Sequence, residues 1–224
     1  MAQRARTRLP QSCRRFCKTL AKLGHGAWVT GTQTLKKTGK EHKIIMKTLI
    51  IYVSQTGFTK KYAQWLAEKT NADLLELKDA KKKEDAFFNE YQAIVFGGWF
   101  MAEKVVQIDW FLNKAASWKD KKLAVFAVGA SPNEAPVVKK VMEKLLTEDQ
   151  KKNVKAFYCQ GGLNYDKMKL SHRLMMKAFA SMLKGKKNAT EQEKQMAEMV
   201  AGSYDISDVK YVLPIVEYLE SQEA

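Results

Sequence analysis

The sequence predicts an α/β fold built on a doubly wound sheet of five parallel strands. From about residue 46 to the end of the chain, short apolar strands alternate with amphipathic helices. The first of these strands is a continuous apolar run, as expected of a strand buried on both faces. With 224 residues, 46 % of them hydrophobic, the chain is long enough for one such domain with a sizeable core.

Residues 49–53 (LIIYV) form the first predicted strand, because every one of them is apolar. Residues 59–71 follow as a helix, because apolar residues recur there at three- and four-residue spacings and make one stripe. Further strands are expected at residues 73–77, 93–96, 123–128 and 154–159, and further helices at residues 105–116, 137–146 and 207–219. This alternation requires helices on both faces of a parallel sheet.

Residues 1–45 are predicted to be a basic, disordered extension in front of a domain at residues 46–224. The formal net charge is +15, but residues 1–45 carry eleven basic residues and one acid, which leaves the domain at +5. The extension is interpreted as upstream of a translation start at Met46, with a targeting peptide or a polyanion-binding arm as alternatives. Binding of nucleic acid by the domain itself is not expected.

No metal site, spanning helix or disulfide framework is expected. Cys13 and Cys17 lie close together, but no second ligand pair follows them, which disfavours zinc. No apolar run approaches the roughly 20 residues that cross a bilayer. The third cysteine, Cys159, makes the count odd, and no signal peptide is evident, so we expect a cytoplasmic protein.

The strongest local signal lies between the first strand and the first helix. Backbone N–H groups at a helix N-terminus favour a phosphate group, and a permissive glycine with three hydroxyl residues suits that geometry. The glycine-rich motifs of nucleoside-triphosphate sites and of dinucleotide sites are missing. The predicted ligand therefore carries a single phosphate group. The alternative is that Ser54 or Thr56 only caps the helix. The candidate residues are Ser54, Gln55, Thr56, Gly57, Phe58 and Thr59.

The strand MKTLIIYVS followed by S-x-T-G-x-T resembles the FMN-phosphate loop of flavodoxins, and Ser54, Thr56, Gly57 and Thr59 match it. The resemblance extends over about residues 46–221. It implies FMN as the cofactor and the sheet order 2-1-3-4-5, with the ligand at the carboxyl ends of the strands.

Two further loops are expected at those strand ends. Gly97 and Gly98 would permit close backbone approach, and Trp99 and Phe100 could stack on the flavin, although both could instead be core aromatics. After the fourth strand, Gly129 and Ala130 open a loop without the aromatic residue by which many electron-carrier flavodoxins cover the outer flavin face. This departure predicts either an outer face open to a substrate or a flavin ring covered by another part of the chain.

An insertion at about residues 160–205 separates the fifth strand from the last helix. Its helix at residues 168–183 has a basic row (Lys169, Arg173, Lys177) beside an apolar row (Leu170, Leu174, Ala178, Met182). Such a helix suits contact with an anionic membrane surface or a flat apolar substrate, or its apolar row packs on the domain. His172, on the same helix, could approach the site, but a lone histidine on the polar side of a helix is more often exposed to solvent, and exposure is expected here.

The insertion resembles the menaquinone-dependent protoporphyrinogen dehydrogenase branch of the flavodoxin-like proteins. This resemblance implies an FMN-dependent oxidoreductase that oxidises protoporphyrinogen IX, a step of heme biosynthesis, and passes electrons to a quinone at the inner face of the membrane. No catalytic acid or base is assigned. The alternatives are an electron carrier between protein partners, an NAD(P)H-dependent quinone or flavin reductase, and a non-enzymatic protein whose basic tail binds nucleic acid or anionic lipid.

Overall fold

The computed structural model describes residues 46–221 and contains a parallel sheet in the order β2-β1-β3-β5-β6. Its strands are β1 (Thr48–Tyr52), β2 (Asp73–Glu76), β3 (Ala93–Met101), β5 (Lys122–Gly129) and β6 (Val154–Gln160). The short strand β4 (Lys104–Val105) pairs antiparallel with the end of β3. With β4 set aside, the order is 2-1-3-4-5, and the predicted flavodoxin-like doubly wound sheet is confirmed. The predicted extension, with Cys13 and Cys17, lies outside the described residues.

The sheet separates two apolar cores, because successive side chains of a strand point to opposite faces. In β1, Leu49 and Ile51 belong to one core and Ile50 and Tyr52 to the other. All five residues of β1 are buried, as the continuous apolar run predicted.

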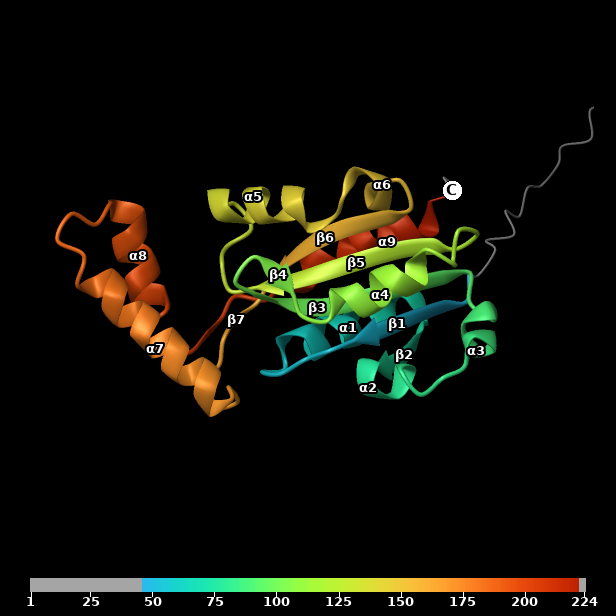
Figure 1. Ribbon diagram of the computed structural model, residues 1–224, viewed down its shortest axis with the longest axis horizontal. Coiled ribbons are helices and arrows are strands. Elements are labelled where there is room, and N and C mark those ends of the chain that lie inside the picture. The colour runs from blue at the N-terminus through green and yellow to red at the C-terminus, as the bar shows by residue number, and fades with distance from the viewer. Residues whose placement is uncertain (1–45, 222–224) are drawn as a thin grey trace, which may run out of the picture. The chain divides into compact units, whose positions relative to one another are not determined.

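Helices cover both faces of the sheet (Figure 1). On one face lie α1 (Phe58–Thr70), the 3-10 turn η2 (Val209–Val212) and α9 (Leu213–Glu220). On the other face lie α2 (Leu77–Ala80), α3 (Asp85–Asn89), α4 (Ile108–Ala115), α5 (Pro136–Leu145) and α6 (Glu148–Lys151). Apart from α6, which buries none of its residues, these helices bury apolar side chains against the sheet.

Some element boundaries differ from the predictions for local reasons. The helix expected from residue 105 begins at Ile108, because Gln107 is left-handed (φ 59°) and residues 104–105 form β4. The strand expected at residues 73–77 ends at Glu76, since Leu77 starts α2. The last helix, expected from residue 207, begins as the 3-10 turn at Val209.

The insertion forms a helical hairpin on a two-stranded stalk. The strands β7 (Gly162–Leu163) and β8 (Tyr204–Asp205) pair antiparallel, and α7 (Leu170–Lys184) and α8 (Glu191–Met199) lie between them. Figure 1 shows this hairpin extending beyond the end of the sheet at which β7 lies. Leu163, Ala180, Leu183, Ala197 and Val200 form a separate small core within the insertion.

The apolar row predicted on α7 does not pack on the domain. Leu170 is 70 % exposed, Leu174 59 % and Met182 64 %, and Ala178 is exposed as well. Another face of α7, with Phe179 and Leu183, packs on α8 instead. Among residues 46–221, no helix is both long and apolar enough to cross a membrane.

Candidate functional site

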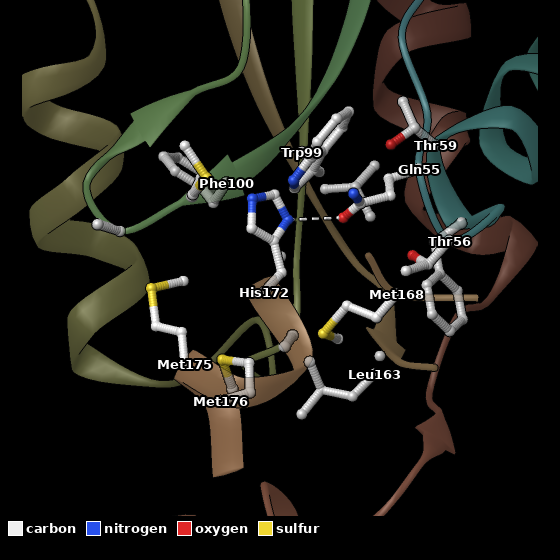
Figure 2. A pocket seen from close by; sticks show the side chains of 17 residues that line it. Gln55, Thr56, Thr59, Trp99, Phe100, Leu163, Met168, His172, Met175 and Met176 are labelled. Atoms are coloured by element: carbon white, nitrogen blue, oxygen red, sulfur yellow. Dashed lines mark hydrogen bonds between the residues drawn. The ribbon is translucent and has the colours of Figure 1, made fainter. Parts of the chain in front are cut away.

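A pocket lies at the carboxyl ends of the parallel strands, where the resemblance predicted a ligand (Figure 2). The loop after β1, the end of β3 and the end of β5 supply one part of its wall, and the insertion supplies the rest. The lining residues are Gln55, Thr56, Phe58, Thr59, Trp99, Phe100, Met101, Ala102, Val128, Gly129, Ala130, Gly162, Leu163, Met168, His172, Met175 and Met176.

The loop between β1 and α1 is shaped by Gly57, whose φ of 102° lies in the left-handed region that favours glycine. Its backbone N–H donates to Ser54 Oγ at 3.2 Å. Gly57 is also the N-cap residue of α1, and no side chain caps the helix. The alternative that Ser54 or Thr56 caps α1 is therefore wrong.

This loop fits a phosphate group. The first N–H groups of α1 lack partners within the helix and carry the positive end of its dipole. Thr56 and Thr59 add hydroxyl groups on the pocket side, and Thr59 is only 2 % exposed. No carboxylate is among the lining residues in the described part of the chain, so nothing there repels a phosphate dianion.

Gly97 and Gly98 lie inside β3, because that strand runs on to Met101. A Cβ atom on Gly97 would meet Phe126 Cζ at 2.1 Å, and one on Gly98 would meet Val105 Cγ1 at 2.5 Å. Neither glycine lines the pocket. The segment expected to be a loop is therefore part of strand β3. Its two glycines leave room for neighbouring side chains and do not approach a ligand.

Trp99 and Phe100 are half-buried and line the pocket, as expected of residues that contact a flat ring. Pairing with β4 fixes their backbone: Val106 N–H donates to the Trp99 carbonyl at 3.0 Å. The Phe100 ring packs near Tyr158, with 6.2 Å between the ring centroids. The two aromatic side chains are therefore held at the pocket by the end of the sheet.

Tyrosine hydroxyls fix the segment that follows β5. Tyr204 donates to the Ala130 carbonyl at 2.6 Å, and Tyr158 donates to the Ser131 carbonyl at 2.7 Å. Burial raises the pKa of Tyr204 to about 12 and raises the pKa of Tyr158 further still. Both phenols stay protonated at neutral pH and keep Gly129 and Ala130 at the pocket wall.

The insertion contributes residues that the sequence did not assign to the site: Leu163, Met168, Met175 and Met176. His172 also lines the pocket, and its Nδ1 lies 2.9 Å from Gln55 Oε1. The prediction of a solvent-exposed His172 is therefore wrong. Met168 lies just before α7, whereas His172, Met175 and Met176 lie three and four residues apart on one face of that helix. This spacing was the available signal.

Of the twelve candidate residues, the structure brings eight together at the pocket. Ser54, Gly57, Gly97 and Gly98 do not line it, although Ser54 and Gly57 shape the loop that does. The site combines a helix N-terminus, hydroxyl groups and an aromatic wall. It defines a protein that binds a flat ring bearing a phosphate group.

The chain belongs to the flavodoxin domain family, whose model matches residues 49–190. This match confirms the predicted family and supports FMN as the cofactor. No curated protein matches the chain.

Solved structures of flavodoxin-like proteins are similar to the chain at low identity. A flavoprotein from Lactobacillus acidophilus in complex with FMN is 18 % identical, with 51 % of this chain and 92 % of that chain covered and a TM-score of 0.37. A flavodoxin from the domain Archaea is 15 % identical, with 69 % and 93 % covered and a TM-score of 0.35. A WrbA-like flavodoxin from Agrobacterium tumefaciens is 17 % identical, with 69 % and 91 % covered and a TM-score of 0.33.

Proposed function

We propose that this protein is an FMN-dependent oxidoreductase that oxidises protoporphyrinogen IX and passes the electrons to a quinone. One observation carries the proposal: the insertion lines the pocket opposite the aromatic wall with Leu163 and three methionines. Flexible thioether side chains adapt to flat apolar molecules. The segment after β5, residues 129–133, carries no aromatic residue, so it does not cover the ring as the loop of an electron carrier does.

The chain's residues would each have a defined part. The loop at residues 54–59 would hold the phosphate, and Trp99 and Phe100 would contact the ring. Bound FMN would supply the electron-transfer chemistry. Leu163 and the methionines of α7 would bind the second ring system and exclude water from it.

The test is an absorption spectrum of the full chain after addition of FMN and desalting, followed by anaerobic addition of protoporphyrinogen IX. Retention of the yellow chromophore and its bleaching by the substrate are expected. Retention without bleaching, with electrons accepted only from a redox protein, would favour an electron carrier. Bleaching by NADPH would favour a nicotinamide-dependent quinone reductase, and a folded chain that holds no FMN would refute the proposal.

A substitution of Met176 tests the substrate side of the pocket independently of the phosphate loop. The Met176→Ser variant removes apolar surface from the substrate side of the pocket and leaves the phosphate loop intact. We expect FMN to be retained and bleaching by protoporphyrinogen to slow at least about tenfold, because one buried apolar side chain contributes about 1–3 kcal/mol. Met199→Ser, on α8 and outside the pocket, is the matched control.

We also propose that the outer face of α7 contacts an anionic membrane surface. This face is defined by the exposed residues Leu170, Leu174, Met175 and Met182, with Lys169 and Lys177 beside them. Apolar side chains flanked by lysines suit the boundary between headgroups and acyl chains. A membrane quinone would then be within reach of the pocket, because Met175 belongs to both surfaces.

Flotation of the full chain with lipid vesicles tests this second proposal. We expect binding to vesicles that contain phosphatidylglycerol and much weaker binding to phosphatidylcholine alone. Leu174→Ser combined with Met182→Ser should abolish it, whereas Val137→Ser, which removes an exposed apolar residue from α5, should not. Equal binding of both variants would refute this role for α7.

A further inference from the structure

Among the lining residues in the described part of the chain, His172 is the one with an imidazole ring, which can both donate and accept a proton. The other lining residues are apolar or carry hydroxyl, amide, indole or thioether groups. Charged residues do flank His172 on α7, but Lys169 is exposed and Arg173 donates to the Asp166 carbonyl at 3.2 Å. The segments at the ends of β1, β3, β5 and β7 contribute no charged side chain to the pocket.

Gln55 fixes which ring nitrogen of His172 carries the proton. The contact joins His172 Nδ1 to Gln55 Oε1 at 2.9 Å, and an amide oxygen can only accept a hydrogen bond. Nδ1 is therefore the donor, and in the neutral ring Nε2 keeps its lone pair. Figure 2 shows the other ring nitrogen pointing away from Gln55, on the side of Phe100.

The same hydrogen bond persists when the ring is protonated, because Nδ1 carries a hydrogen in both states. His172 can thus gain or lose a proton at Nε2 without losing its position. A group that alternates between acid and base during turnover needs this property.

We propose that His172 exchanges the substrate proton through Nε2 and that Gln55 is the positioning residue that sets its tautomer. This inference rests on the proposed oxidoreductase function. Reduction of a quinone to a hydroquinone adds two electrons and two protons. Bound, reduced FMN would supply both electrons and one proton as a hydride, and the His172 imidazolium would give the second proton to a quinone oxygen.

The His172 ring then regains a proton from solvent. In the opposite direction, the neutral ring would take a proton from a substrate that gives up a hydride, and bound, oxidised FMN would supply the acceptor for that hydride. Electrons and protons balance in both directions, and no further co-reactant is needed.

The first test reads the tautomer directly, without FMN or turnover. In ¹⁵N NMR spectra of the full chain, the ring signals of His172 are identified by their loss in His172→Asn. We expect the neutral ring to carry its proton on Nδ1 and to shift toward the Nε2–H form in Gln55→Leu. An Nε2–H tautomer in the unmodified chain would overturn the assignment of Gln55.

The second test compares two oxidants of the reduced, FMN-loaded chain under anaerobic conditions. Menadione takes up protons as it is reduced, whereas ferricenium accepts only an electron. We expect His172→Asn to slow oxidation by menadione about 10²-fold or more, a loss at least tenfold larger than any loss with ferricenium. It should also flatten the pH dependence of the menadione rate.

Ser171→Asn, one residue away and exposed, is the control for changes in α7. Equal menadione rates in the unmodified chain and His172→Asn at every pH, with FMN retained, would overturn the role of His172 and leave the oxidoreductase function standing. A chain that holds no FMN would instead refute the function itself.

Discussion

At the scale of single residues, glycine is needed for different physical reasons at different positions. Gly57 has open space around it and is required by its φ of 102°. Gly97 has an ordinary backbone conformation, and the Phe126 ring occupies the place of its missing side chain. The sequence alone shows a glycine in both cases and cannot separate the two causes.

Gly97→Ala should lower the free energy of unfolding by about 1–3 kcal/mol, because the new methyl group overlaps the Phe126 ring. Urea unfolding measures the loss. Gly202→Ala, where nothing lies within 4 Å, should cost much less and serves as the control. In a Phe126→Leu background the cost of Gly97→Ala should shrink, and an unchanged cost would contradict the steric explanation.

Tyr204 makes stability depend on pH in the alkaline range. Burial raises its pKa to about 12, above the ordinary value near 10, so the folded state favours the neutral phenol. This contribution is fully present below about pH 10 and is lost as the pH rises toward 12. Tyr204→Phe should show a shallower loss of stability over that range, measured by urea unfolding at fixed pH values. An identical slope would argue against this role.

At the scale of elements, regular segments could be predicted and irregular ones could not. The run at residues 49–53 identified β1 because burial on both faces leaves a continuous apolar signal. In contrast, α8 was missed, since residues 191–199 are mostly polar and pack only through residues such as Ala197. The extension of β3 through Gly97 and Gly98 was missed because glycines normally signal a loop.

The part of the candidate site that consists of residues close together in the sequence could be predicted. The loop at residues 54–59 lies at the pocket because it connects neighbouring elements. The contact between Gln55 and His172 joins residues 117 positions apart, and only the stalk β7–β8 brings α7 back to the loop. No spacing rule encodes that contact.

Helix α8 should depend on its N-terminal capping box. The Thr190 side chain accepts from Glu193 N–H at 3.3 Å, and the Glu193 side chain accepts from Thr190 N–H at 2.9 Å. Thr190→Ala should destabilise the hairpin by about 1 kcal/mol and speed amide exchange in α7 and α8 but not in β5. Thr147→Ala removes the same motif from α6 and is the matched control. Unchanged exchange in α8 would contradict this dependence.

At the scale of the whole molecule, the insertion has a core of its own and contacts the sheet domain through the stalk and through the His172–Gln55 hydrogen bond. Its small core is distinct from the two cores of the sheet, and Leu163 pairs with Tyr204 at its base. Lys61 of α1 binds the end of the stalk, with Nζ 2.9 Å from Asp205 Oδ2. The stalk is therefore bound to the sheet domain, whereas α7 and α8 pack mainly on each other.

Replacing residues 164–203 with an Asn-Gly turn should leave a folded domain, because Leu163 and Tyr204 already face each other in an antiparallel pair. Circular dichroism should show a cooperative thermal transition, and the phosphate loop should still retain FMN. Vesicle binding and the selective reaction with menadione should be lost together. A chain that no longer unfolds cooperatively would show that the hairpin is part of the core.

The paired stalk also bears on the entropy of assembling the sheet. Residues 161–208 separate β6 from η2, and α9 completes the core only after that segment has been closed into a loop. The entropic cost of closing a flexible loop rises slowly, by about 0.6 kcal/mol for each doubling of its length. Pairing of β7 with β8 shortens the effective loop further, because it joins the two ends of the hairpin directly. A long segment can therefore be accommodated beside the cofactor pocket at small entropic cost to the docking of α9.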